Sequence, residues 1–188
     1  MKKAAGSFAA LSLIGAGILI SACSLSYETQ EEAGTTTPEC VFSELVLHRY
    51  EDRQLSLELQ AQTMEQYTDS ASFAENNTFT TWNSDGTVDT TGTCQLLSAH
   101  TADKRYALFG GIQLHNADNA LTIEAEALRY NGTSEQLTAA IGETVHLFKD
   151  DLELTGTGFS ASGVSHTYQF SGPVQGTLLT SDPAEDTP

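Results

Sequence analysis

Five histidines are the side chains of this sequence best suited to acid–base or metal chemistry, and they are dispersed along the chain: His48, His100, His115, His146 and His166. None belongs to an HExxH metal motif, and no GxSxG nucleophile elbow, P-loop or strand-to-helix GxGxxG motif occurs. Asp150 and Asp151 form an acidic pair between two apolar runs, which is ordinary turn chemistry. We therefore predict that the chain is not an enzyme and has no catalytic site, metal site or cofactor.

The N-terminus has the order of a secretory signal peptide. Two lysines precede an uncharged apolar run, residues 8–20, and two small residues come before Cys23. The run is shorter than the roughly 20 residues of a transmembrane helix, which makes a permanent transmembrane anchor the weaker interpretation. The segment Ile20–Cys23 resembles the lipobox of bacterial lipoproteins, which implies a cleaved signal peptide over residues 1–22 and lipidation of Cys23. An ordinary signal peptide with a coincidental cysteine is the alternative.

Two further cysteines, Cys40 and Cys94, form an even pair in a chain that is expected to be exported. Disulfides persist in oxidising compartments, so we predict a bridge between them. The bridge would stabilise the fold by roughly 2 to 4 kcal/mol through restriction of the unfolded chain. No CxxC or Cys/His ligand spacing supports a redox or metal role instead.

The charge balance argues against nucleic acid as a partner. The chain carries 25 acidic and 8 basic residues, a formal net charge of −17. Such a charge repels a phosphate backbone, and the basic residues are scattered along the sequence. A solvated acidic surface is the simpler explanation of the charge.

The composition divides the chain into an ordered domain and two tails. Residues 23–39 are rich in Glu, Thr, Gly and Pro, a composition that favours a flexible tether. Residues 181–188 contain two prolines and three acids and are expected to form a disordered tail. We assign residues 40–180 to one folded domain.

A period of two dominates this domain. The stretch Leu55–Ala61 alternates apolar and polar residues, and the same pattern recurs in short phrases up to Tyr168–Phe170. Turn-forming pairs such as Gly110-Gly111 and Asn131-Gly132 separate the phrases. The segment Phe42–Tyr67 also admits a helix, but its clean alternation favours strands. Many short strands with tight turns predict an all-β antiparallel fold, a β-jellyroll or twisted two-sheet roll.

The order of these phrases from Tyr106 onward carries a resemblance. Residues 106–114 (YALFGGIQL) precede residues 121–130 (LTIEAEALRY), and residues 152–159 (LELTGTGF) and 170–176 (FSGPVQG) follow. The series resembles the OstA-like family of lipopolysaccharide transport, specifically its LptC branch, over residues 38–179. Members of that branch are usually held by an N-terminal transmembrane helix, which the lipobox would replace here.

The resemblance implies a β-jellyroll without a catalytic step. Such a protein takes lipopolysaccharide or a similar glycolipid from an inner-membrane ABC transporter and passes it to a periplasmic LptA-like partner through sheet edges. The expected location is the periplasm, with the lipid anchor in the inner membrane, or in the outer membrane as the alternative. The C-terminal strand, Tyr168–Leu178, is the expected edge.

Strand phase alone predicts which side chains would line the lipid-binding interior: Leu57, Leu59, Phe79, Leu108, Ile112, Leu114, Ile123, Leu147, Leu154 and Phe170. The same residues would equally fill the dry core of a sandwich. A second hypothesis for the whole chain is a surface-exposed lipoprotein that binds a host or polysaccharide ligand, because a tether and an acidic surface suit that role too.

Overall fold

The computed structural model describes residues 37–165 and 167–180, which form antiparallel strands. Six long strands come first: β1 (Cys40–Glu51), β2 (Gln54–Gln66), β3 (Ala71–Trp82), β4 (Val88–His100), β5 (Arg105–Asn116) and β6 (Leu121–Asn131). Six short strands follow: β7 (Gln136–Ala139), β8 (Thr144–Lys149), β9 (Leu152–Thr157), β10 (Phe159–Ser162), β11 (Thr167–Phe170) and β12 (Val174–Leu178). The predicted all-β antiparallel fold is confirmed.

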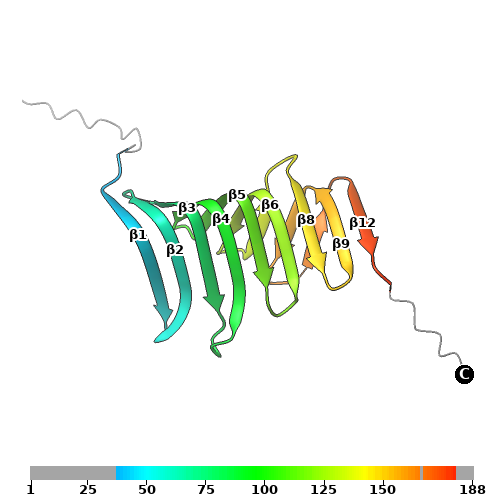
Figure 1. The fold of residues 1–188 in the computed structure, drawn as a ribbon, viewed down its shortest axis with the longest axis horizontal. Coiled ribbons are helices and arrows are strands. Elements are labelled where there is room, and N and C mark those ends of the chain that lie inside the picture. Colours follow the sequence, from blue (N-terminus) through cyan, green and yellow to red (C-terminus); the bar gives the residue numbers. More distant parts are fainter. Residues whose placement is uncertain (1–36, 166, 181–188) are drawn as a thin grey trace, which may run out of the picture. The chain divides into compact units, whose positions relative to one another are not determined.

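Each of the first six strands pairs with its sequence neighbours, and the sheet then divides at β6 (Figure 1). Residues 121–124 of β6 pair with β8, which continues through β9 to β12. Residues 128–131 pair with β7, which continues through β10 to β11. One sheet therefore supplies two layers. We call the layer that contains β8, β9 and β12 layer 1, and the layer that contains β7, β10 and β11 layer 2.

The long strands reach both layers because each bends near its middle. The pairings of β2 through β6 all shift register at this level. Backbone φ is positive at Glu44 of β1, at Glu75 and Asn76 of β3, and at Gly110 and Gly111 of β5. Such bulges add a residue to one strand and turn the sheet. The expected two-sheet roll is thus one sheet folded along a line of bulges.

Two expectations are corrected here. The pair Gly110-Gly111 is not a turn between strands but the bend inside β5, where positive φ suits glycine. The stretch Tyr168–Leu178 is not one strand, because β11 ends at Phe170 in layer 2 and β12 begins at Val174 in layer 1. Both of these strands are edges of the sheet, as predicted.

The helix alternative for Phe42–Tyr67 is wrong. This segment forms β1 and β2, joined by a tight hairpin whose two turn residues, Asp52 and Arg53, have positive φ. Within residues 37–165 and 167–180 no helix is long and apolar enough to cross a membrane. The predicted signal peptide, most of the tether and the C-terminal tail lie outside the described residues.

Candidate functional site

The inner face of layer 1 carries one continuous apolar row, read directly from the strand register. Its members are opposite one another on neighbouring strands from β1 to β12: Leu47, Leu59, Phe79, Gly92, Leu114, Ile123, Leu147, Leu154 and Gly176. Side chains on directly opposed positions of an antiparallel sheet lie on the same face and in contact distance. A single lane of apolar side chains therefore crosses the whole layer.

Layer 2 carries a matching row. Successive register partners on its inner face are Phe42, Met64, Phe73, Leu97, Leu108, Leu128 and Ala139, and Phe159 pairs with Phe170 where the layer ends. Members of both rows pack into one hydrophobic cluster. The interior is thus bounded by two apolar rows, one from each layer.

The predicted lining residues fall on these rows or beside them. Six lie on the layer 1 row (Leu59, Phe79, Leu114, Ile123, Leu147 and Leu154), and two, Leu108 and Phe170, lie on the layer 2 row. Ile112 is buried in the same cluster, two residues before Leu114 in β5, and Leu57 is half-buried, two residues before Leu59 in β2. The pattern of alternation within each strand missed most of the layer 2 row. Its apolar residues, such as Phe73, Leu97 and Leu108, lie on different strands, and only the pairing of these strands brings them into one row.

Burial along the rows is uneven. Leu128 on β6 and Leu147 on β8, strands that are paired on both sides, are 0% exposed, whereas Phe42 on edge strand β1 is 48% exposed. Leu47, the other row end on β1, is only partly buried. The interior is a packed core at its centre and an exposed apolar surface at the β1 end.

The opposite end is closed by the chain itself. The segment between β9 and β10 and the segment between β11 and β12 cross between the layers side by side. Backbone hydrogen bonds join them: Ser171 N–H donates to Gly158 O, and Gly172 N–H donates to Thr157 O. The rings of Phe159 and Phe170 pack here with centroids 5.3 Å apart. An apolar molecule therefore has freer access from the β1 end.

A close contact in the layer 1 row lies at Gly92. The ring of Phe79 occupies the place of a side chain there, since a Cβ on Gly92 would lie 2.2 Å from Phe79 Cζ. Glycine in a strand interior marks such a close approach. Phe79 thus fills the interior by lying over a residue that has no side chain.

The core contains one buried polar side chain among the described residues, Asn77, at the bend of β3. Its Nδ2 donates to the carbonyls of Phe73 and Gln95, at 2.9 and 3.1 Å, and so satisfies backbone groups that the bulges of β3 and β4 release. Its Oδ1 has no hydrogen-bond partner. Asn77 therefore holds the bends of two neighbouring strands together.

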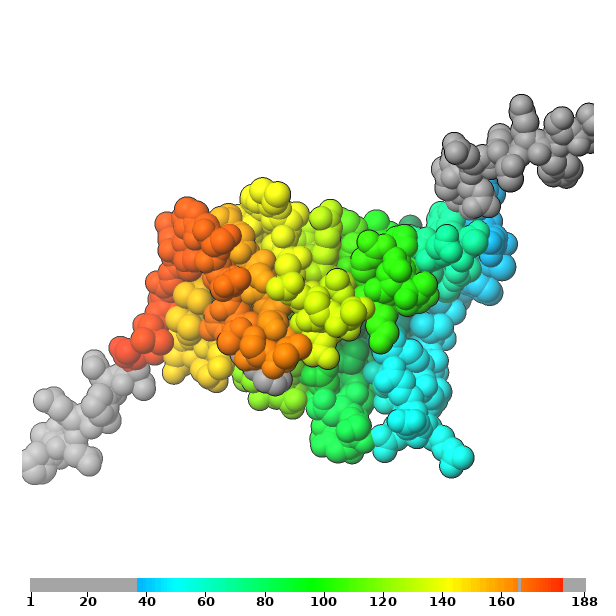
Figure 2. Space-filling view, turned by 180° about the vertical axis from the view of Figure 1, so that it is seen from behind, coloured from blue at the N-terminus to red at the C-terminus, as the bar shows by residue number. Residues whose placement is uncertain are grey.

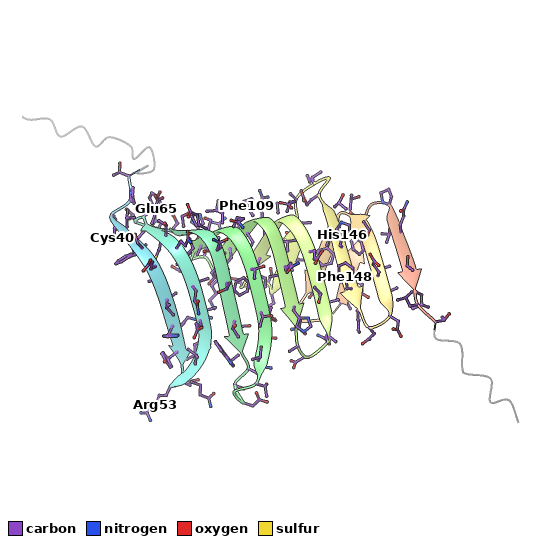
Figure 3. The ribbon with its side chains drawn as sticks, in the orientation of Figure 1. Cys40, Arg53, Glu65, Phe109, His146 and Phe148 are labelled. Atoms are coloured by element: carbon purple, nitrogen blue, oxygen red, sulfur yellow. The ribbon has the colours of Figure 1, made fainter. Side chains whose placement is uncertain are left out.

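The predicted Cys40–Cys94 bridge is not formed, and both thiols are free. Cys40 is exposed at the start of edge strand β1 (Figure 3), whereas Cys94 is buried at the bend of β4. Cys40 is level with Gln66, Ala71 and Ala99 in the register, so two strands and half a strand length separate the two cysteines. Burial raises the pKa of Cys94 to about 11.

The described histidines behave as surface residues on strands. His48 lies 3.0 Å from Glu58, His115 contacts the hydroxyl of Thr122, and His146 contacts that of Thr155. Hydrogen bonds from Gln60 and His48 lower the pKa of Glu58. Residues 37–165 and 167–180 contain no group of three or more side chains placed to hold a metal ion.

The two ends of the sheet expose unpaired strand edges. β1 pairs only with β2, β11 only with β10, and β12 only with β9 among the described strands. Large apolar side chains are exposed on these edges: Val41, Phe42, Val46 and Tyr50 on β1, and Val174 and Leu178 on β12. Free N–H and C=O groups beside apolar side chains are suited to pairing with a further strand.

No protein-family model matches the chain, and no curated protein matches it in sequence. Among solved structures, a match is found to the crystal structure of LptH, the LptA homologous periplasmic component of the conserved lipopolysaccharide transport device from Pseudomonas aeruginosa. The match has 9% sequence identity and a TM-score of 0.31, and it covers 77% of this chain and 96% of that chain.

Proposed function

We propose that this chain is a non-enzymatic carrier that binds the acyl chains of lipopolysaccharide, or of a similar glycolipid, between the two layers of its folded sheet. The observation that carries the proposal is the pair of facing apolar rows that runs from the exposed β1 end to β12 and β11. Each CH₂ group of a lipid tail that leaves water gains about 0.8 kcal/mol, so a lane of this kind suits tails better than sugars.

The packed centre sets the way in which a lipid would enter. Leu128 and Leu147 leave no exposed surface at the middle of the lane, while Phe42 at the β1 end does. A tail would therefore make its first contact with Phe42 and Leu47 and then displace the neighbouring side chains, the ring of Phe79 over Gly92 among them. Entry costs local repacking, which the burial of several CH₂ groups offsets.

Transfer to and from partners would use the sheet edges. A strand added to β1 or to β12 would extend the same sheet, and the register would continue the apolar rows from one protein into the next. We infer an inner-membrane ABC transporter as the donor and a periplasmic LptA-like protein as the acceptor, consistent with the family resemblance of residues 38–179. Lipidation at Cys23 would hold the chain at the periplasmic face of the inner membrane.

Site-specific photo-crosslinking in cells tests the proposal. Benzoylphenylalanine replaces Phe42 or Phe79 in the full-length protein, since both are aromatic residues on the inner rows. The matched control replaces Gln113, an exposed residue of β5 between inward-facing Ile112 and Leu114. Irradiation should give lipopolysaccharide adducts at the two inner positions and none at Gln113. Equal labelling at all three positions, or none at Phe42 and Phe79, would refute a lipid-binding interior.

The location is tested separately by protease treatment of intact cells. A periplasmic carrier should remain protected until the outer membrane is opened. Release of the domain from intact cells would contradict the periplasmic assignment and favour a surface lipoprotein that binds a host or polysaccharide ligand.

A further inference from the structure

Layer 2 has a hollow on its outer face, the face turned away from the apolar rows of the interior. Register partners in two successive rows line it: Ser98, Ala107, Arg129 and Thr138 in one, and His100, Arg105, Asn131 and Gln136 in the other. The first row contributes three small side chains and Arg129, and the second row contributes four longer polar or charged side chains. The hollow is a depression open to solvent, with a volume of about 410 Å³.

The charge of this hollow is opposite to that of the chain. It is lined by two arginines and a histidine and by no acidic side chain, in a protein with 25 acidic and 8 basic residues. Lys104, in the turn before β5, immediately precedes Arg105 in the sequence. Arg129 makes no ion pair within the described part of the chain, whereas Arg105 is paired with exposed Asp103. Three cations, Lys104, Arg105 and Arg129, are thus gathered at one place by the pairing of β5 with β6. Figure 2 shows the molecule from behind, with the face opposite to the one that is in front in Figure 1.

The uncharged lining residues are hydrogen-bonding groups. Asn131 and Gln136 offer amide donors and acceptors, and Ser98 and Thr138 offer hydroxyls. Side-chain amides and hydroxyls complement the hydroxyl groups of a sugar ring, while arginine binds a phosphate through two parallel hydrogen bonds. This combination fits a sugar that carries a phosphate better than it fits either a neutral sugar or a bare anion.

Two tyrosines connect the hollow with the interior. Tyr106 and Tyr130 both line the hollow, and their rings lie 6.2 Å apart on neighbouring strands. Tyr106 also packs against the hydrophobic core. Burial and the nearby carboxylate of Glu135 raise the pKa of Tyr130, so its phenol stays neutral near pH 7. The rim at these tyrosines is therefore where a polar head group outside and acyl chains inside would meet.

We propose that this hollow binds the phosphorylated saccharide of the carried glycolipid, with Arg105 and Arg129 on the phosphate and Asn131 and Gln136 on sugar hydroxyls. The proposal rests on the carrier function above and adds the class of head group that the carrier accepts. It also gives the lipid a direction, with its sugar at the layer 2 rim between β5 and β6.

Ligand-observed saturation-transfer NMR on the full-length protein in detergent tests the site with three probes: glucosamine 6-phosphate, glucosamine and inorganic phosphate. Glucosamine 6-phosphate should bind, and Arg129→Gln should weaken its binding about tenfold or more, because a charge-assisted contact is lost. Arg53→Gln is the matched control, since Arg53 is exposed in the β1–β2 turn at the β1 end of the sheet (Figure 3), whereas the hollow lies on β4 to β7. That variant should bind like the unchanged protein.

Three results would overturn the assignment. Absence of binding would remove the site, equal binding of inorganic phosphate would show an anion site without sugar recognition, and equal loss in Arg53→Gln would show a general effect of net charge. The carrier function is judged independently by the adducts at Phe42 and Phe79. Retained interior adducts in an Arg105→Gln/Arg129→Gln double variant that no longer binds the sugar phosphate would separate the head-group site from the lane.

Discussion

Replacing Leu147 by Ala should destabilise the protein far more than the same change at Leu47. Both leucines belong to the inner row of layer 1, and their substitutions remove the same three carbon atoms. Leu147 is 0% exposed on β8, which is paired on both sides, whereas Leu47 is partly buried on edge strand β1. Buried Leu→Ala changes cost about 2 to 5 kcal/mol because transfer and cavity terms add. We expect a loss in this range for Leu147→Ala.

The expected loss for Leu47→Ala is about 1 kcal/mol. Full burial of a leucine is worth roughly 1.5 to 3 kcal/mol relative to exposure, and Leu47 has only part of that burial to lose. Its position at an edge also lets neighbouring side chains settle into the vacated space, which keeps the cavity term small.

Urea unfolding followed by circular dichroism measures both variants against the unchanged chain. Equal slopes of free energy against urea would show that the two variants unfold over the same surface, so that the midpoints report stability. A cost for Leu147→Ala no greater than that for Leu47→Ala would refute the packed centre. It would then follow that the lane is open along its length and that a lipid enters without displacing side chains.

Three further changes test individual contacts of the core. Gly92→Ala should lower the free energy of unfolding by about 1 to 3 kcal/mol, because the added methyl group contacts the ring of Phe79. Adding Phe79→Leu should recover part of this loss. Simple additivity of the two losses in a double-mutant cycle would contradict the close approach. Asn77→Ala should lower the free energy of unfolding by about 2 kcal/mol or more, because the carbonyls of Phe73 and Gln95 lose their donor. The control Gln113→Ala, on the exposed face, should change stability little. Equal effects of the two substitutions would show that Asn77 does not hold the bends. In the folded Cys23→Ser variant, iodoacetamide should modify exposed Cys40 and spare buried Cys94, and two labels found by mass spectrometry without denaturant would contradict the burial. Because burial raises the pKa of Cys94 to about 11, its contribution to stability is present below pH 9 and is lost as the pH rises to about 11. Cys94→Ala should remove this loss of stability at alkaline pH.

The inner face of the sheet was predictable from the sequence because its period is local. Leu59, Leu114 and Ile123 stand in clear alternation with polar neighbours, and all three are buried. The partners across the fold were not predictable, since register depends on where each strand bends. Glu44, Glu75 and Asn76 adopt positive φ without being glycine, and no composition signal marks them as bend residues.

The same limit explains why the bridge between the cysteines was wrongly predicted and why the grouping of the cations was not foreseen. The pair Cys40 and Cys94, in a chain expected to be exported, predicted a bridge, but the register leaves Cys40 at an edge and Cys94 at the bend of a strand between two others. Arg105 and Arg129 look isolated in sequence, yet the pairing of β5 with β6 brings them to neighbouring rows. Long-range pairing, which periodicity does not report, decides both outcomes.

The line of bulges across β2 to β6 restricts how the interior can widen. A sandwich of two separate sheets can part by sliding one sheet over the other, with every ladder of hydrogen bonds intact. Here the long strands continue from layer 1 into layer 2, so neither layer can move without changing the angle at the bends. Opening is therefore a collective flexing about one line, with Asn77 on that line. The room available to a guest molecule is set by the stiffness of this line as well as by the side chains that face it.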